Sequence, residues 1–457
     1  MRRRDFLKAG VAGACGILTG MRGLCAADSP AETKPAEFYL PPDSSYTIVD
    51  SVRDSIRFAT ERTLFDYNGH LRCESSFVDV TGKPMRWHDF GTLEGPGWAA
   101  NAAGGAYELY LFGSQTNDQK LQQTGLKVLD HVLEDGFVDY ETGFIKGYRD
   151  TANGKLCLNF KHDNKWFCPG SMAKIAYQLL IFSDLLAGER REQMRSVAVK
   201  NARWIDENVG LAPNDWYPRR VTPDGTPYSK SATGGGDPIF QKSGDGLFIV
   251  QLMTALTRRG LADYSETVAE RIGTFMDKGG LFGSINHDTY DEQENVSYAV
   301  GYRTLRAAAT VLEDDSVREF AYDVCLQGLE RFKMRENRNG VQTRGLLYME
   351  DSWDTAYLWE NAEASLAYLE AFLDTGKTQY RRDGLTILRA IAKHHHGPYG
   401  FLTEGVDWNN HVGSQHHFDG AEYGDIKYTE PLLNNMHITE PTVLAMKHTM
   451  AAGGETD

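Results

Sequence analysis

Cysteine, proline and long apolar runs are scarce in this chain of 457 residues. It has 6 cysteines and 15 prolines, and the cysteines include no Cys-x-x-Cys pair and match no zinc-motif spacing. No stretch after the first 27 residues reaches the ~18 consecutive apolar residues that cross a bilayer. With 41% hydrophobic and 24% charged residues, the composition is that of a globular protein, which excludes disordered, collagen-like and coiled-coil classes.

Positive charge is also in short supply. The chain has 48 Lys and Arg against 63 Asp and Glu, for a net charge of −15. The first 27 residues hold five basic side chains and one acidic one, so their removal would leave a net charge of about −19. Such a body repels phosphate backbones and anionic lipids, which argues against nucleic acid and membrane partners. An acidic small substrate stays open, because a local basic pocket can override the mean charge.

The N-terminus reads as an export signal. Residues 3–8 are Arg-Arg-Asp-Phe-Leu-Lys, a weakly apolar stretch follows over 9–20, and Ala26-Ala27 offers a cleavage site. This order resembles a twin-arginine signal peptide, here residues 1–27, and implies a periplasmic or secreted protein. We predict a flexible segment over 28–44 and one catalytic domain over 45–452.

Hydrophobic periodicity predicts twelve helices in the mature chain. Their expected positions are near 51–66, 95–112, 118–135, 168–187, 190–208, 243–259, 263–278, 295–313, 316–333, 359–374, 377–396 and 439–452. Apolar helices alternate with charged, one-faced helices, which indicates an inner and an outer layer. We therefore predict an all-α fold, an (α/α)6 toroid or barrel of six helical hairpins.

The connections follow the same alternation. Links from an inner helix to the next outer helix are a few residues long, as expected of antiparallel neighbours. Links from an outer helix to the next inner helix are long, and they should gather at one mouth of the toroid, over the N-termini of the inner helices. These long links are 67–94, 136–167, 209–242, 279–294, 334–358 and 397–438.

Tryptophan is concentrated around this expected mouth. Of eight Trp, five lie in the long links, and Trp98 and Trp359 stand where inner helices begin. Flat indole rings suit the C–H faces of sugar rings, so the bias predicts a carbohydrate substrate, although long loops also need small cores of their own. The tryptophans that we expect to bind substrate are Trp98, Trp166, Trp353, Trp359 and Trp408.

Histidines share the long links, but they show no metal-ligand spacing such as His-Glu-x-x-His. We expect His162, His416 and His417 to contact substrate, and we predict no metal and no cofactor. Zinc at 411–417 or calcium near Asp407 and Asn409 remain weaker alternatives. Disulfide use is undecided, although Cys157 and Cys168 are close enough in sequence to pair.

A toroid of six hairpins with Trp, His and carboxylates at one mouth resembles the six-hairpin glycosidase superfamily. That superfamily includes glucuronidases and unsaturated glucuronyl hydrolases, and related toroids serve as 2-epimerases and polysaccharide lyases. The resemblance implies a glycoside hydrolase acting on a uronic acid. The paired Asp-Asp start of unsaturated-uronyl hydrolases is absent from the helix near 168.

Glycoside hydrolysis generally uses two carboxyl groups, one on each side of the scissile bond. Four candidates lie in mouth loops or first helical turns, each within six residues of a Trp: Glu94, Asp163, Glu360 and Glu404. Glu440, between Thr439 and Pro441, instead looks like an ordinary helix-start carboxylate. Each of the four could equally be a carboxylate that stabilises a helix N-terminus.

An acidic sugar would need cations, and Lys165, Arg219 and Arg344 lie in the long links. Arg can bind a carboxylate through two parallel hydrogen bonds. We therefore expect an exo-acting hydrolase that removes a glucuronide-type residue from a plant, algal or bacterial glycan.

Two other functions stay open. A lyase would use His162 or Tyr148 as base, with Asn159 or Arg149 to neutralise the uronate. A non-catalytic glycan-binding protein would need the Trp-lined mouth without the carboxylates. An epimerase would fit the toroid, but the export signal argues against one.

Overall fold

The computed structural model describes residues 37–228, 243–286, 291–396 and 400–452. Within these residues it contains twelve α-helices, one in each stretch that periodicity predicts, although the bounds of α1, α2 and α9 differ from those expected. The helices are α1 (Ile48–Phe58), α2 (Ala102–Thr116), α3 (Gln119–Glu134), α4 (Pro169–Ser183), α5 (Glu189–Asn208), α6 (Gly246–Arg258), α7 (Ser265–Asp277), α8 (Asn295–Leu312), α9 (Asp315–Phe320), α10 (Leu358–Thr375), α11 (Thr378–Ala392) and α12 (Thr439–Ala452). The predicted signal peptide, residues 1–27, lies outside the described residues.

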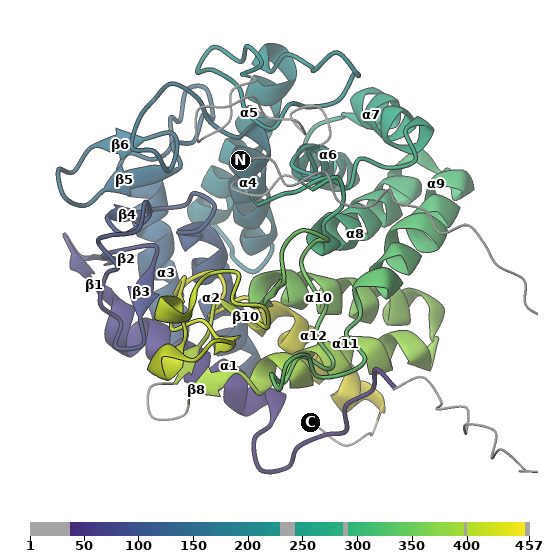
Figure 1. The fold of residues 1–457 in the computed structure, drawn as a ribbon. Helices are drawn as coiled ribbons and strands as arrows, with labels where there is room; N and C mark the ends of the chain where they lie inside the picture. The colour runs from purple at the N-terminus through teal and green to yellow at the C-terminus, as the bar shows by residue number, and fades with distance from the viewer. Residues whose placement is uncertain (1–36, 229–242, 287–290, 397–399, 453–457) are drawn as a thin grey trace, which may run out of the picture. The chain divides into compact units, whose positions relative to one another are not determined.

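Six helices form an inner layer, and their contacts close into a cycle. Helix α2 packs on α4, α4 on α6, α6 on α8, α8 on α10, α10 on α12, and α12 returns to α2. These helices are buried nearly all round, as the apolar sequences of α4 and α6 require. Figure 1 shows α6, α8 and α10 inside α7, α9 and α11.

Each outer helix packs on the inner helix that precedes it in the chain: α3 on α2, α5 on α4, α7 on α6, α9 on α8 and α11 on α10. Helix α1 contacts both α11 and α12. The amphipathic pattern explains this layer, since α3 buries Leu121, Val128 and Val132 and exposes its charged face. The outer stretch 316–333 is less regular than predicted, because α9 runs into a π-helical segment, Ala321–Leu326.

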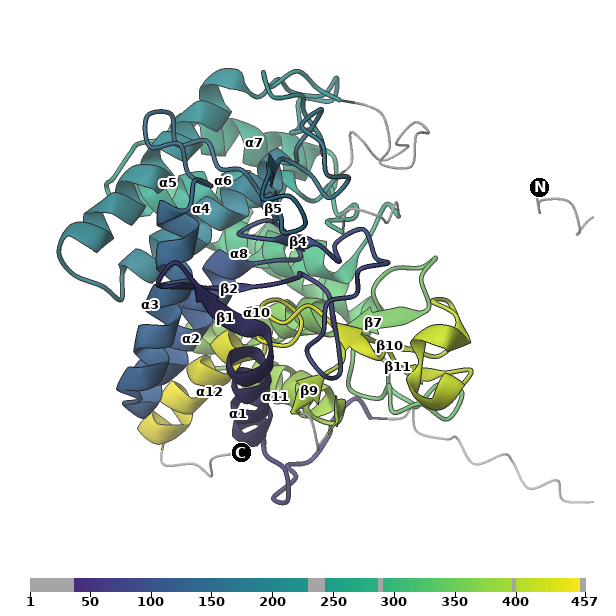
Figure 2. The ribbon, with the colours of Figure 1, turned by 90° about the vertical axis from the view of Figure 1, so that its left-hand side faces the viewer.

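Short strands occupy the long links, a feature that the all-α prediction omitted. They are β1 (Leu64–Tyr67), β2 (His70–Cys73), β3 (Val78–Asp79), β4 (Leu93–Glu94), β5 (Tyr148–Asp150), β6 (Leu156–Cys157), β7 (Thr355–Tyr357), β8 (His395–His396), β9 (Phe401–Leu402), β10 (Gly405–Asp407), β11 (Gly424–Asp425) and β12 (Tyr428–Thr429). All their pairings are antiparallel, and several join different links: β4 with β5, β7 with β10, and β3 with β12. Figure 2 shows β7, β10 and β11 together.

The first described residues differ from the prediction of a flexible segment over 28–44. Phe38 and Leu40 are each 5% exposed and belong to the main hydrophobic core. Arg344 and Arg389 donate hydrogen bonds to the carbonyls of Tyr39 and Leu40. Residues 37–40 therefore belong to the folded unit, because the side chains of Phe38 and Leu40 anchor this stretch.

Helix α2 begins later than predicted, at Ala102 instead of 95. Gly95 has φ +119°, and a Cβ there would meet the Phe137 ring at 2.6 Å, so the chain turns sharply before the helix. Asn101 also has a left-handed backbone, φ 46°. Trp98 consequently stands on an irregular corner ahead of the helix.

Candidate active site

A cavity of about 450 Å³ lies where the long links meet. Its described lining comes from five of the six links, together with residues that precede or begin inner helices. Aromatic rings dominate it: Phe77, Trp87, His88, Phe90, Trp98, Phe160, Trp353, Tyr357, Trp359, His411, His416 and Tyr428. Its polar side chains are Asp89, Lys161, Asn286, Glu404 and Glu430. The predicted mouth therefore exists as an aromatic cavity of ligand size.

Two buried tryptophans form one wall of the cavity. The rings of Trp98 and Trp359 lie 5.1 Å apart at 83°, an edge-to-face pair. The Nζ of Lys174, on α4, lies 4.4 Å from the Trp98 ring and 5.3 Å from the Trp359 ring. A cation behind two indoles holds both rings by cation–π attraction.

The outer part of the cavity carries stacked pairs of aromatic side chains. Trp87 is 66% exposed, and its ring stacks on His416 at 5.2 Å. Trp353 lies 3.9 Å from the His411 ring. Both indoles line the cavity, where a sugar ring can pack on them, so these rings suit a sugar-binding surface.

Glu404 is one of two buried carboxylates in the cavity lining. Its exposure is 6%, and strand pairing fixes its backbone. The Glu404 N–H donates to the Tyr428 carbonyl at 3.0 Å, and the Leu358 N–H donates to the Glu404 carbonyl at 3.1 Å. The pairing of β10 with β7 thus sets this carboxylate beside the start of α10.

Glu430 is the second buried carboxylate of the cavity lining, with 5% of its surface exposed. Its carboxylate accepts a hydrogen bond from the side-chain amide of Asn434. The Asn434 side-chain oxygen in turn accepts the Trp359 N–H at 2.9 Å. One asparagine therefore ties Glu430 to the same helix start that Glu404 adjoins.

A group of three buried glutamates lies behind the cavity wall, joined to it through Asn286. The Asn286 amide donates to Glu294 at 2.7 Å and also to Glu360. Burial raises the pKa of Glu294 to about 7 and the pKa of Glu350 to about 8. Burial and the neighbouring Glu294 also raise the pKa of Glu360. These carboxyl groups therefore hold protons near neutral pH.

Below the two tryptophans, charged side chains from several inner helices form a network. His437 lies 2.9 Å from Glu108 and 3.0 Å from Glu363, and Arg303 bonds Glu363 at 2.7 Å. Although burial opposes it, the attraction of Glu108 and Glu363 raises the pKa of His437 to about 9. Burial lowers the pKa of Lys174 to about 8. The network balances its charges and supports the cavity from beneath.

The structure places the four predicted carboxylates in different surroundings. Only Glu404 belongs to the described cavity lining. Glu360 is fully buried behind Asn286. Asp163 accepts the Asn159 amide at 2.8 Å and the Lys165 N–H at 3.0 Å, which stabilises its own turn.

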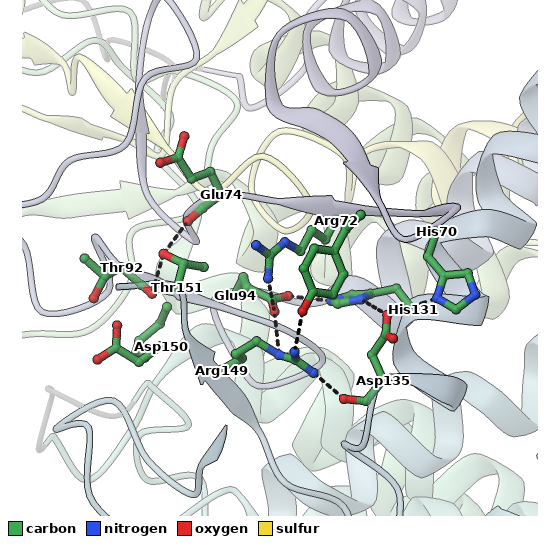
Figure 3. A network of polar contacts seen from close by, with 12 residues as sticks. His70, Arg72, Glu74, Thr92, Glu94, His131, Asp135, Arg149, Asp150 and Thr151 are labelled. Atoms are coloured by element: carbon green, nitrogen blue, oxygen red, sulfur yellow. Dashed lines mark hydrogen bonds and ion pairs between the residues drawn. The ribbon is translucent and has the colours of Figure 1, made fainter. Parts of the chain in front are cut away.

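Glu94 is part of a separate buried network, which Figure 3 shows from close by. It is 1% exposed and lies 2.7 Å from His131, 3.3 Å from Arg149 and 3.6 Å from Arg72. His131 continues to Asp135 at 2.6 Å. These contacts join β2, β4 and β5 to α3, so the geometry gives Glu94 a structural role.

The residues proposed for a lyase are engaged elsewhere. Tyr148 is 3% exposed, and burial raises the pKa of its hydroxyl, which makes it a poor base. His162 lies 2.7 Å from the Asp89 carbonyl and 3.2 Å from Asp150. Arg149 belongs to the Glu94 network, and Asn159 bonds Asp163 and the Trp166 carbonyl.

Some of the predicted substrate-binding residues line the cavity, and the others lie outside its described lining. Trp98, Trp353, Trp359 and His416 line the cavity. Among the others, Trp166 packs in a small core under Arg220, Trp408 is 7% exposed in the main core, and Lys165 pairs with Asp163 on the surface. Arg219 is fully buried, and its positive charge acts on Glu294. Arg344 donates a hydrogen bond to the Tyr39 carbonyl. His417 bonds the Ala421 carbonyl and lies 3.2 Å from Asp407.

Metal ligation and disulfides can be checked for the described part of the chain. There, no group of three His, Cys, Asp or Glu side chains is arranged to hold a metal ion. Asp407 accepts the N–H groups of Asn409 and Val412, both at 2.9 Å, so its oxygens order the loop. Cys73, Cys157, Cys168 and Cys325 are buried and form no disulfide.

Sequence reasoning missed Glu430 and Glu294. Glu294 immediately precedes α8, but no Trp lies within six residues of it, so the rule that selected Glu360 passed over it. Glu430 lies in the longest link, four residues before the Asn434 that binds it but far in sequence from Trp359. No local signal distinguishes it.

Comparisons with known proteins find solved structures that share this fold. No family model and no curated protein sequence matches the chain. Among solved structures, a sugar epimerase from a ruminal bacterium matches with TM-score 0.60 and 13% identity over 88% of this chain and 98% of its own. A GH76 α-mannanase from Bacteroides thetaiotaomicron matches with TM-score 0.57 and 7% identity over 89% and 98%.

A Salmonella enterica protein, described as a possible member of the GH105 family, matches with TM-score 0.50 and 13% identity over 92% and 100%. The first two of these three structures are described as a sugar epimerase and an α-mannanase, and all three share the fold of this chain. At such identities the likeness shows the fold alone. No described helix is both long enough and apolar enough to cross a membrane.

Proposed function

We propose that the chain is an exported glycoside hydrolase with an (α/α)6 barrel, acting on an oligosaccharide or polysaccharide. The observation that carries the proposal is the cavity itself, where Glu404 and Glu430 lie among aromatic rings. Two positioned carboxyl groups supply the acid and the base or nucleophile that glycoside hydrolysis needs. The twin-arginine pattern at residues 3–8 supports export.

In this proposal one of the two carboxyl groups protonates the leaving oxygen, and the other activates water or attacks the sugar carbon. The sugar ring packs against Trp98 and Trp359, face-on to one indole only, because the two rings are nearly perpendicular. Asn434 holds Glu430 relative to Trp359, so that the sugar and the carboxylate keep one geometry. Asn286, which lines the cavity, offers a polar contact for sugar hydroxyls.

The charge of the cavity bears on the substrate. Its described lining has three carboxylates, Asp89, Glu404 and Glu430, and one lysine, Lys161, which pairs with Asp89. A uronate would have to bind where cations exceed carboxylates.

An isomerising enzyme is the second candidate, because three histidines line the cavity. Burial lowers the pKa of His88 to about 4 and also lowers the pKa of His416, so both imidazoles are neutral at pH 7. The sugar epimerase likeness agrees with such chemistry.

Product analysis by mass spectrometry separates these functions. The full chain is incubated with a panel of neutral and acidic oligosaccharides in ¹⁸O-water, and in parallel in deuterium oxide. A hydrolase shortens the chain and takes up one heavy oxygen at the new reducing end. A lyase gives an unsaturated end without the label. An epimerase or isomerase leaves chain length unchanged and introduces deuterium beside the carbonyl. Either of the last two outcomes would overturn the proposal.

A further inference from the structure

Lys174, on α4, is buried beside the two tryptophans of the aromatic cavity. Its exposure is 5%, and its Nζ atom has no hydrogen-bond partner among the described residues. Nζ lies 4.4 Å from the Trp98 ring, 5.3 Å from the Trp359 ring and 6.0 Å from the Phe248 ring. A buried ammonium group without hydrogen bonds is costly, and the attraction of these rings offsets part of that cost.

Neutralisation of carboxylates does not explain this position. Glu363 and Glu108 attract Lys174, but each of them has a closer cationic partner. His437 lies 2.9 Å from Glu108 and 3.0 Å from Glu363. Arg303 bonds Glu363 at 2.7 Å. Lys174 forms no ion pair within the described part of the chain, whereas its ammonium group faces both indoles of the cavity wall.

The charges that act on Lys174 come from carboxylates on two other inner helices. Glu108 belongs to α2 and Glu363 to α10. Helices α5 and α6 also pack on α4, and the residues that they bury include no titratable side chain. Asp245, just before α6, lies against Gly170, one helical turn earlier on α4. Burial outweighs the two glutamates and lowers the pKa of Lys174 to about 8, so the ammonium group is charged at neutral pH and loses its proton in mildly alkaline solution.

Lys174 joins two indoles that come from different parts of the chain. Trp98 stands ahead of α2, and Trp359 lies in the first turn of α10. Both rings line the cavity, whereas Lys174 is not part of its described lining. A cation that attracts both rings from within the protein restricts their motion, and the attraction is lost with the charge. We propose that Lys174 is a positioning residue: its ammonium group holds Trp98 and Trp359 in the orientation that receives a sugar, and loss of its proton releases both rings.

This inference deepens the proposed function and rests on it for the nature of the ligand. It adds that sugar affinity is high at neutral pH and falls as the pH rises through about 8, because the charged lysine is the form that holds the two rings. The effect on the rings requires no ligand, so it can be measured separately from sugar binding.

Fluorine NMR of the full chain labelled with 5-fluorotryptophan tests the effect on the rings. Each of the eight Trp gives a resonance, and Trp98→Phe and Trp359→Phe assign the two of interest. From pH 6.5 to 9.5 both resonances should shift and broaden in one step with a midpoint near 8. Lys174→Met keeps the length of the side chain without its charge, so both resonances should be broad already at pH 7 and show no step.

Two variants provide the controls. Lys377→Met removes a lysine that lies over the Tyr380 ring instead of a tryptophan, and it should keep the step. Lys174→Arg carries a charge that does not titrate in this range, so its two resonances should stay sharp throughout. A step that survives Lys174→Met would belong to another group, such as His437, whose ring lies 6.4 Å from that of Trp359, and would overturn the proposal. Sharp resonances in Lys174→Met would overturn it too.

Sugar binding gives the second readout. Cellotetraose, mannotetraose and trigalacturonate, as neutral and acidic probes, are titrated into the Glu404→Gln protein with and without Lys174→Met. At pH 7 the loss of the cation should weaken binding of the best probe about three- to tenfold, and Lys174→Arg should restore most of it. Between pH 7 and 9 the affinity should fall by a similar factor in the chain that keeps Lys174, but not in the one with Lys174→Met.

The two readouts separate this inference from the proposed function. A merely structural role of Lys174 would lower the melting temperature without changing how sugar affinity depends on pH, and that result would overturn the inference. Ring resonances that respond as expected, in a chain that binds none of the three probes, would support the role of Lys174 and count against the proposed function instead.

Discussion

As the proposed catalytic pair, Glu404 and Glu430 should each matter more for the chemical step than for substrate binding. Replacing either with Gln keeps size and hydrogen bonding but removes the proton-transfer group. We expect Glu404→Gln and Glu430→Gln each to lower kcat by about 10²-fold or more, with little change in KM. Steady-state kinetics on the best substrate of the panel measures this. Asp163→Asn, which changes a turn carboxylate, is the control and should retain most activity.

Glu94 gives the opposite prediction, although sequence reasoning grouped it with Glu404. Its carboxylate faces Arg72, Arg149 and His131 inside the protein. Glu94→Gln leaves Arg72 and Arg149 without this buried counter-charge, so the free energy of unfolding should fall by roughly 3–5 kcal/mol. Denaturant unfolding measures the loss.

The matched control is Glu74→Gln, which removes an exposed ion pair with Arg86 and should cost less than about 1 kcal/mol. A Glu94→Gln protein of normal stability and no activity would instead return Glu94 to the list of catalytic candidates.

The sequence selected four candidate carboxylates but could not predict the surroundings of each one. The position of a carboxylate relative to a helix start and a Trp selected Glu94, Asp163, Glu360 and Glu404 alike. Their surroundings differ because distant segments supply them: His131 on α3 reaches Glu94, and Asn286 reaches Glu360. Such contacts are set by tertiary structure, and no local pattern encodes them.

At the scale of elements, the helices follow from periodicity and the strands do not. Amphipathic outer helices and uniformly apolar inner helices have strong, long-range patterns, which explains why all twelve were placed. The strands in the links are two to four residues long, too short for an alternating pattern to emerge. Yet the pairing of β7 with β10 is what positions Glu404.

The loop that carries Trp87 should matter for binding alone. The Trp87 indole is 66% exposed and stacks on the His416 ring at the surface of the cavity. Trp87→Ala should therefore leave the melting temperature unchanged. Loss of a stacking contact worth about 0.5–1.5 kcal/mol predicts a two- to tenfold weaker sugar affinity. Titration of sugar into the Glu404→Gln protein measures the affinity. Phe65→Ala, another exposed aromatic, should show no loss; equal loss in both would argue against the cavity as the binding site.

At the scale of the whole molecule, buried protons should make stability depend on pH. Glu294, Glu350 and Glu440 have pKa values raised to about 7, 8 and 7, and that of His437 is raised to about 9. Between pH 6.5 and 8 the folded chain therefore binds more protons than the unfolded chain, so stability falls as pH rises. The expected fall is roughly 2–4 kcal/mol.

Urea unfolding at pH 6.5, 7.2 and 8 tests this. Glu350→Gln keeps the Ser284 contact but cannot ionise, so its stability should fall less steeply than that of the wild-type chain. Identical slopes for the two proteins would mean that Glu350 ionises normally in the folded state.

The central claim is that a sugar chain lies in the aromatic cavity between Glu404 and Glu430. A crystal structure of the Glu430→Gln protein with an uncleaved oligosaccharide from the panel tests it most directly. The account predicts a sugar ring against Trp98 and Trp359, with the glycosidic oxygen within hydrogen-bond reach of one of the two side chains. An oligosaccharide bound elsewhere, or one in the cavity whose glycosidic oxygens reach neither position, would contradict it.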